Sequence, residues 1–213
     1  MKMIFIDSIS ELKFQILAFK AFQLRFLNHM SKAKKTAKKL FFYGVAVAFF
    51  TAVFDLMSKQ MIFSILENIA STQNIDNPEI KIFDFFSLVY VWNYGVSFGM
   101  FSELEGSWII FSVIQFLIII TLFFWLHQNT KPHFSWALGL VIGGAFGNLI
   151  DRLKNGAVAD FLDFHIASYH WPAFNLADSC IFIGVVILLF DEVIFPKKTA
   201  RKSWKKSQKK SLL

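Results

Sequence analysis

Cysteine is nearly absent from the sequence, since Cys180 is the only one among 213 residues. A single thiol excludes an internal disulfide framework and a cysteine-rich metal site. The sequence also lacks a glycine-rich phosphate loop that opens a helix. His165 and His170 do not have metal-ligand spacing and have no His-Glu motif around them, so we expect no bound metal. Ser97 and Ser179 have no histidine base in a motif, which disfavours serine catalysis.

Acidic residues are missing from two strongly basic runs. Five lysines lie within residues 32–39 and eight basic residues within 197–210, so these runs carry +13 in a chain whose net charge is +7. The remaining residues therefore sum to −6. Nucleic-acid binding is one interpretation of such runs. Basic flanks of membrane helices that face anionic lipid explain them better, and we expect membrane lipids as partners and no nucleic acid.

Hydrophobic residues make up 55% of the chain, and the mean hydropathy is +0.51. These values indicate an integral membrane protein with one compact helical domain. Four apolar segments each approach the ~20 residues that cross ~30 Å of hydrocarbon, at about 41–61, 107–126, 134–152 and 176–195. The sequence therefore predicts a mainly α membrane protein with four transmembrane helices.

We expect three parts along the chain: an N-terminal extension and basic flank over residues 1–39, a four-helix membrane domain over 40–196, and a basic tail over 197–213. Residues 1–31 are mildly amphipathic and contain no uninterrupted run long enough to span a membrane. They fit a helix on the membrane surface, or an extension that precedes a natural start at Met30.

Orientation follows from the positive-inside rule. Both termini are basic, whereas the loop between the first two apolar segments contains six acidic residues against Lys81. We therefore expect both termini in the cytoplasm and the two larger loops outside. Residues 80–101 are rich in β-branched and aromatic side chains and lead into a turn marked by Asn93 and Gly95, which predicts a short sheet or hairpin at the membrane interface.

Under this topology the costly polar residues gather at the outer ends of the spans. Asn175 has the position of an N-cap, which would place Asp178 in the first helical turn, where the helix dipole favours a charged carboxylate. Asp160 is flanked by apolar residues that favour its neutral form. If Asp160 and Asp178 meet, they can hold a water between one protonated and one ionised carboxyl, as aspartic proteases do. Asp163 is an alternative to Asp160.

The other polar residues at this level have structural interpretations as well. Asp151 and Arg152 are more typical of a helix end than of chemistry, and Asn148 is typical of an interhelical hydrogen bond. Asp55 and Lys59 share one helix face and can pair, either to brace the outer layer or to position a substrate.

Four blocks of residues resemble the lipoprotein signal peptidases (signal peptidase II), which are membrane aspartic peptidases of bacteria. They occur in the family's order across roughly residues 40–195: Asp55-Leu-Met-Ser-Lys59; Asn93-Tyr-Gly-Val-Ser-Phe-Gly99; Gly143-Gly-Ala-Phe-Gly-Asn-Leu-Ile-Asp-Arg-Leu153 with Gly156-Ala-Val-Ala-Asp160; and Phe174-Asn-Leu-Ala-Asp178-Ser179. Two features depart from the family pattern. The chain has Val96-Ser97 where Ala-Ala is usual, and it carries the N-terminal extension.

The resemblance implies four spanning helices, a small extracytoplasmic β-cradle, and an endopeptidase that cuts before the lipid-modified cysteine of prolipoproteins. It implies Asp160 and Asp178 as the catalytic dyad, with Asp151 and Gly95 as structural residues. It also implies a set of substrate-binding or site-orienting residues: Asn93, Asn148, Arg152, Asn175, Asp55 and Lys59. Neither a metal nor an organic cofactor is implied. The expected setting is a monomer in the bacterial inner membrane, with its active site toward the extracytoplasmic face.

Two other classes of function remain open from the residues alone. A small proton-coupled transporter also places aspartates and an arginine among spans, although it would bury them nearer mid-membrane. A non-catalytic membrane scaffold would use the same residues for stability only.

Overall fold

The computed structural model describes residues 2–95 and 106–191. Two sequence features named above lie outside the described residues: the basic tail at 197–213 and the Val96-Ser97 departure. Within the described part the chain forms helices and a small sheet in the order α1, β1, β2, α2, α3, β3, β4, α4.

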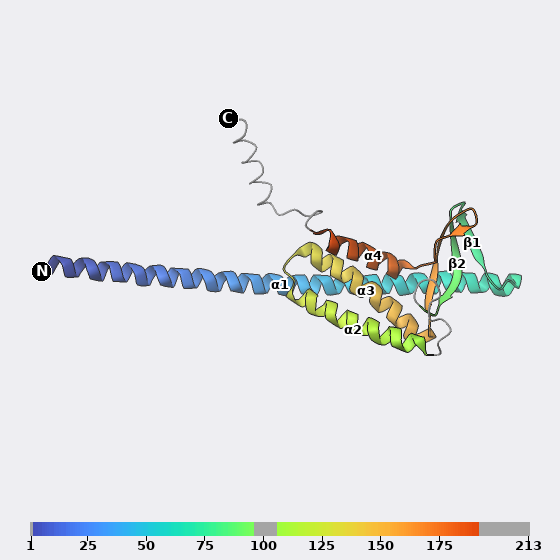
Figure 1. Ribbon diagram of the computed structural model, residues 1–213, viewed down its shortest axis with the longest axis horizontal. Coiled ribbons are helices and arrows are strands. Elements are labelled where there is room, and N and C mark those ends of the chain that lie inside the picture. Colours follow the sequence, from blue (N-terminus) through green and yellow to red (C-terminus); the bar gives the residue numbers. More distant parts are fainter. Residues whose placement is uncertain (1, 96–105, 192–213) are drawn as a thin grey trace, which may run out of the picture.

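Helix α1, Lys2–Gln73, is a single helix of 72 residues that includes the extension, the basic run at 32–39 and the first apolar segment. Its first half projects beyond the other helices, and its second half packs along them (Figure 1). The first apolar segment predicted at 41–61 is therefore part of a much longer helix. Glycine and proline are absent from the helix except for Gly44, so little in this stretch interrupts helical structure.

Three further helices pack beside α1. These are α2 (Ser107–Gln128), α3 (Pro132–Asn155) and α4 (Leu176–Leu189). Three helical stretches of the described residues have the length and apolar composition to cross a membrane, namely Gln23–Gln73, Trp108–Gln128 and Pro132–Asn155. Helix α4 is apolar but shorter, at 14 residues.

Helix α3 lies at the centre of this bundle and contacts the other three helices. Two-thirds of its apolar window is buried, compared with about a fifth of the windows in α1 and α2. Its glycines allow that central position. A Cβ at Gly139 would lie 2.7 Å from the Gly44 carbonyl oxygen of α1, and one at Gly144 would lie 2.5 Å from the Ala177 carbonyl oxygen of α4. These glycines therefore let two different helices approach α3 closely.

The sheet caps the end of the bundle that lies away from the N-terminus (Figure 1). Its four antiparallel strands are ordered β1-β2-β3-β4, with bounds Glu79–Phe83, Phe86–Asn93, Val158–Ile166 and Tyr169–His170. The hairpin expected within 80–101 is confirmed by the β1–β2 pair. Strands β3 and β4 fall in a segment that the sequence interpretation left as an outer loop. A cluster of Phe63, Ala159 and Phe161 joins α1 to the sheet.

Candidate active site

Helix α4 begins with a capping box. The Asn175 side-chain oxygen accepts the Asp178 backbone N–H at 2.9 Å, and Asp178 Oδ2 accepts the Asn175 backbone N–H at 3.2 Å. The N-cap predicted at Asn175 is confirmed, and Asp178 lies at the third helical position. Four residues of local sequence therefore determine where the Asp178 carboxylate lies relative to the helix start.

Asp160 approaches the same point from the sheet. It is the third residue of β3 and is 2% exposed. Its Oδ2 accepts from the Asn93 side-chain amide at 2.9 Å, and its Oδ1 accepts from the Asn175 side-chain amide at 2.7 Å. Burial, followed by the negative charge of Asp178, raises the pKa of Asp160 to about 7. This carboxyl therefore keeps its proton to a higher pH than an ordinary aspartic acid does.

Asp160 and Asp178 line one cavity of about 550 Å³ between the sheet, α3 and α4. Asn93, Gly95 and Arg152 complete its polar wall. The remaining lining residues are mostly apolar and come from the segment before α4 and from α4 itself: Trp171, Pro172, Ala173, Phe174, Ile181, Phe182 and Val185. The cavity thus joins two carboxyl groups to an apolar wall that runs along a helix.

A buried ionic network contacts the Asp178 side of the cavity through Asn148. Lys59 Nζ lies 2.7 Å from Asp55 and 2.9 Å from Asp151, and it donates to Asn148 Oδ1 at 2.8 Å. Asn148 in turn donates to Asp178 Oδ1 at 2.8 Å. The pairing predicted for Asp55 and Lys59 is confirmed. The network is buried, since Lys59 is 3% exposed and Asp55 is 0% exposed.

Two backbone contacts extend this network to the neighbouring elements. Asp55 Oδ1 accepts the Ala177 backbone N–H at 2.8 Å, which ties α1 to the first turn of α4. Asp151 Oδ2 accepts the Ala159 backbone N–H at 3.3 Å, which ties α3 to the strand that carries Asp160. Asp55 and Asp151 therefore anchor the helix that bears Asp178 and the strand that bears Asp160, and neither lines the cavity.

The Arg152 side chain bonds to helix α2 and not to the Lys59 network. It donates to Gln115 Oε1 of α2 at 2.7 Å, and Gln115 Nε2 donates to the Ala145 carbonyl at 2.7 Å. Gln115 is a residue that sequence reasoning missed. Gln115 could have been recognised as an amide side chain within a predicted span, because such an amide is typical of an interhelical hydrogen bond, as at Asn148.

The structure distinguishes between the two aspartates considered as partners of Asp178. Asp160 lies in the cavity with Asp178, whereas Asp163 contacts His170, with 2.8 Å between His170 Nδ1 and Asp163 Oδ2. Gly95 belongs to a turn in which its backbone N–H donates to Asn93 Oδ1 at 3.1 Å. The polar residues that the resemblance implied for the site therefore gather around the two carboxyls, whereas Asp163 lies with His165 and His170.

Residues 47–194 match the family model for signal peptidase (SPase) II. The chain belongs to the signal peptidase II family. A lipoprotein signal peptidase of Anaplasma marginale is 48% identical over 118 residues, which are 55% of this chain and 69% of that protein. One from Francisella tularensis subsp. novicida is 38% identical over 165 residues, covering 76% and 96% of the two chains.

Solved structures of bacterial membrane enzymes share this fold. One determined by the in meso method at 2.3 Å is 28% identical with a TM-score of 0.57, and it covers 73% of this chain and 92% of its own. Another at 1.9 Å is 26% identical with a TM-score of 0.58, and the coverage is 73% and 94%. Membership of the signal peptidase II family makes the chain a membrane peptidase, and the apolar helices agree with that setting.

Proposed function

We propose that this chain is an aspartic endopeptidase that removes signal peptides from diacylglyceryl-modified prolipoproteins, cutting before the lipid-modified cysteine. The observation that carries the aspartic mechanism is the shared position of Asp160 and Asp178. Both line one cavity, and Asn175 hydrogen-bonds to both. Two carboxyls in that relation suit a water-activating dyad in which one holds a proton and the other is ionised.

Each residue then has a definite task in the proposed mechanism. The ionised carboxyl takes a proton from water as the water oxygen attacks the scissile carbonyl carbon. The protonated carboxyl, which the raised pKa assigns to Asp160, donates a hydrogen bond to the carbonyl oxygen and later supplies the proton to the leaving amine. Arg152 and Asn93, both on the cavity wall, orient the substrate backbone.

The apolar side of the cavity fits a lipid-modified substrate. Ile181 and Val185 line it from α4, together with Phe182, which is 70% exposed. In a membrane this face borders hydrocarbon, so acyl chains stay in the bilayer while the peptide reaches the carboxyls at the sheet end. The same position disfavours a transporter, whose ionisable groups would lie nearer mid-membrane.

The proposed setting is the bacterial inner membrane. We propose that the chain acts there as a monomer with four spans, with both termini cytoplasmic and the sheet on the extracytoplasmic side. The basic run at 32–39 supports this orientation, because it lies at the opposite end of the bundle from the sheet (Figure 1).

Cleavage of a lipid-modified precursor in membranes tests the proposal. Asp160→Asn and Asp178→Asn should each lower the rate by at least about 100-fold, since each removes a general acid–base group. Asp84→Asn is the matched control, because the Asp84 side chain is 96% exposed and pairs only with Lys81 in the described structure. Full activity in either dyad variant would rule out the assignment, and cleavage of a precursor without the diacylglyceryl group would rule out the substrate class.

A further inference from the structure

A second cluster of chemically active side chains lies on the β3–β4 hairpin. Asp163 and His165 are two residues apart on β3, so they share one face of the strand. His170 is the direct cross-strand partner of His165 in the β3–β4 register. The two histidines are five residues apart in the sequence, and the hairpin brings them side by side, so their spacing alone did not reveal the cluster.

The three side chains converge on one oxygen atom. His170 Nδ1 lies 2.8 Å from Asp163 Oδ2, and His165 Nδ1 lies 3.2 Å from the same oxygen. The two imidazole rings stack with their centroids 4.8 Å apart and an interplanar angle of 25°. One ligand atom from each residue can be chosen so that all three lie within 4.8 Å of one another.

Burial makes this arrangement costly without a cation. The Asp163 and His165 side chains are 7% and 11% exposed, and His165 Nδ1, although it lies 3.2 Å from Asp163 Oδ2, is buried without a hydrogen bond of acceptable geometry to any described residue. An unsatisfied buried nitrogen costs free energy, and so does a buried carboxylate. A positive ion between the two Nδ1 atoms and Asp163 would satisfy all three groups together.

We propose that Asp163, His165 and His170 bind a divalent transition-metal ion, with Zn²⁺ as the best match. Imidazole and carboxylate ligands suit Zn²⁺, whereas Mg²⁺ and Ca²⁺ prefer oxygen ligands alone. Metal–ligand bonds of about 2.0–2.2 Å in a tetrahedral site place ligand atoms about 3.3 Å apart. The 2.8 and 3.2 Å separations need only small adjustments to reach that spacing. A water molecule would occupy the fourth coordination position of the ion, on the side of His170, whose side chain is 55% exposed.

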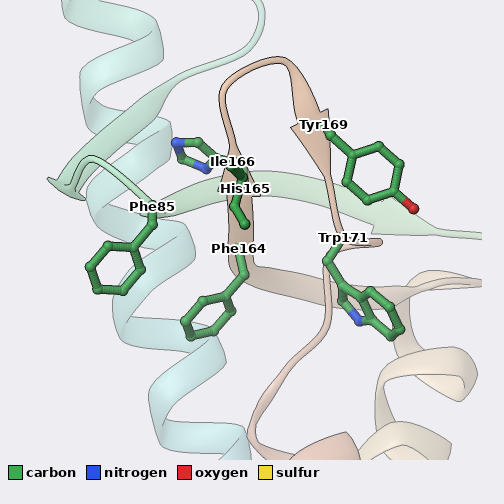
Figure 2. A pocket seen from close by; sticks show the side chains of 6 residues that line it. All are labelled: Phe85, Phe164, His165, Ile166, Tyr169 and Trp171. Carbon is green, nitrogen blue, oxygen red and sulfur yellow. The ribbon is translucent and has the colours of Figure 1, made fainter.

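The metal has no part in the peptidase chemistry. Asp160 and Asp163 are three residues apart on β3 and therefore point to opposite faces of the strand. The dyad cavity is lined by none of the three ligands. Figure 2 shows the His165 imidazole lying apart from the ring of Phe164, its neighbour on β3.

The ion would instead clamp the hairpin. His165 lies on β3 and His170 on β4. The next residue, Trp171, lines both the aromatic pocket of Figure 2 and the cavity that contains Asp160 and Asp178. Strand β4 has only two residues, so backbone pairing holds it weakly. A metal bridge across the strands adds a constraint that reaches the wall of the active-site cavity.

Calorimetric titration with Zn²⁺ tests the proposal on the full chain, purified in detergent without a polyhistidine tag and stripped with a chelator. We expect one saturable equivalent of Zn²⁺, with Mg²⁺ unable to compete. His165→Gln, His170→Gln and Asp163→Asn should each weaken binding by at least about tenfold, since each removes a direct ligand. Co²⁺ should give the visible absorption of a four-coordinate site in the wild type and lose it in His170→Gln.

His127→Gln is the matched control, because His127 lies on α2, is exposed and contacts Phe41. It should leave the titration unchanged. The absence of saturable Zn²⁺ binding would overturn the proposal, and so would binding that the His165 and His170 variants leave intact or that His127→Gln removes. The His170 side chain is more than half exposed, so His170→Gln keeps the test valid if the buried variants do not fold.

Discussion

Asn175 donates its side-chain amide to Asp160 Oδ1 at 2.7 Å, while its own side-chain oxygen caps the helix that carries Asp178. A single side chain therefore performs two separable tasks. It begins α4, and it fixes the distance between that helix and strand β3. Substitutions at Asn175 can separate the two tasks because other residues can serve as an N-cap without offering an amide donor.

Asn175→Ser and Asn175→Ala should lower precursor cleavage to a similar extent, about 10-fold to 100-fold, because both remove the donor to Asp160. Asn175→Ala should also unfold about 1 kcal/mol more easily than Asn175→Ser, because serine can still cap α4. Cleavage rates and thermal unfolding in detergent measure the two effects. Wild-type cleavage by Asn175→Ser would show that the amide has no role in the site.

The raised pKa of Asp160 predicts the pH dependence of cleavage. With a pKa of about 7, Asp160 holds its proton below that value and loses it above, so kcat/KM should fall about tenfold per pH unit above neutrality. Asn93 donates to Asp160 and lowers its pKa, so Asn93→Leu should move the descending limb to higher pH. A pH–rate profile measures both, and a limb that stays in place in Asn93→Leu would contradict the assignment.

The raised pKa of Asp160 also makes the stability of the folded chain depend on pH. The pKa of Asp160 is about 7 in the folded chain against an ordinary value of 3.8, so the folded state binds more protons between these two values. Stability should therefore fall as the pH rises from about 4 to 7, and Asp160→Asn should remove this part of the pH dependence. Unfolding of both proteins across this range measures the effect, and identical slopes would contradict it.

The network around Lys59 predicts a large loss of stability when its cation is removed. Lys59→Met leaves Asp55 and Asp151 buried without their shared cation, which should cost about 3–5 kcal/mol. Lys81→Met is the control. Its side chain is 60% exposed and pairs with Asp84, so the change should be within about 1 kcal/mol. Denaturant unfolding in detergent compares the two, and equal shifts would mean that the buried network adds no stability.

Close packing of α3 on α4 predicts a further effect near the dyad. A Cβ at Gly144 would lie 2.5 Å from the Ala177 carbonyl oxygen, so Gly144→Ala must push apart the two helices at the turn that carries Asp178. We expect a loss of about 1–3 kcal/mol and a fall in kcat. Lys154→Ala, at an exposed position of the same helix, should change neither by much. Unchanged cleavage by Gly144→Ala would show that the Asp178 turn tolerates this displacement.

Much of the fold follows from local sequence. The apolar segments at 107–126 and 134–152 correspond to α2 and α3 within a few residues at each end, because long apolar runs in a membrane must satisfy their backbone groups as helices. The capping box at Asn175 is equally local, since its two hydrogen bonds link residues three apart. The β1–β2 hairpin was visible from its β-branched and aromatic residues.

Other features depend on packing between distant parts of the chain. Lys59 and Asn148 are 89 residues apart, and Asn93 and Asp160 are 67 residues apart. No periodicity in the sequence reports which apolar faces meet, so neither contact was predictable from spacing. Strand β3 was missed for the same reason. It pairs with β2 across the whole of α2 and α3, and its two aspartates and its alanine dilute the strand preference of its Val, Phe and Ile residues.

Helices α2 and α3, the N-cap at Asn175 and the motifs that resemble signal peptidase II could all be recognised in the sequence, because they depend on composition and on neighbours within one helical turn, whereas the full length of α1 could not. Spacing left Asp160 and Asp163 as alternatives, and the resemblance favoured Asp160; the packed fold shows that Asp160 shares a cavity with Asp178 and that His165 pairs with His170. The physical reason is strand geometry. Alternate residues of β3 face opposite sides, so a shift of one residue in register would have exchanged the two aspartates.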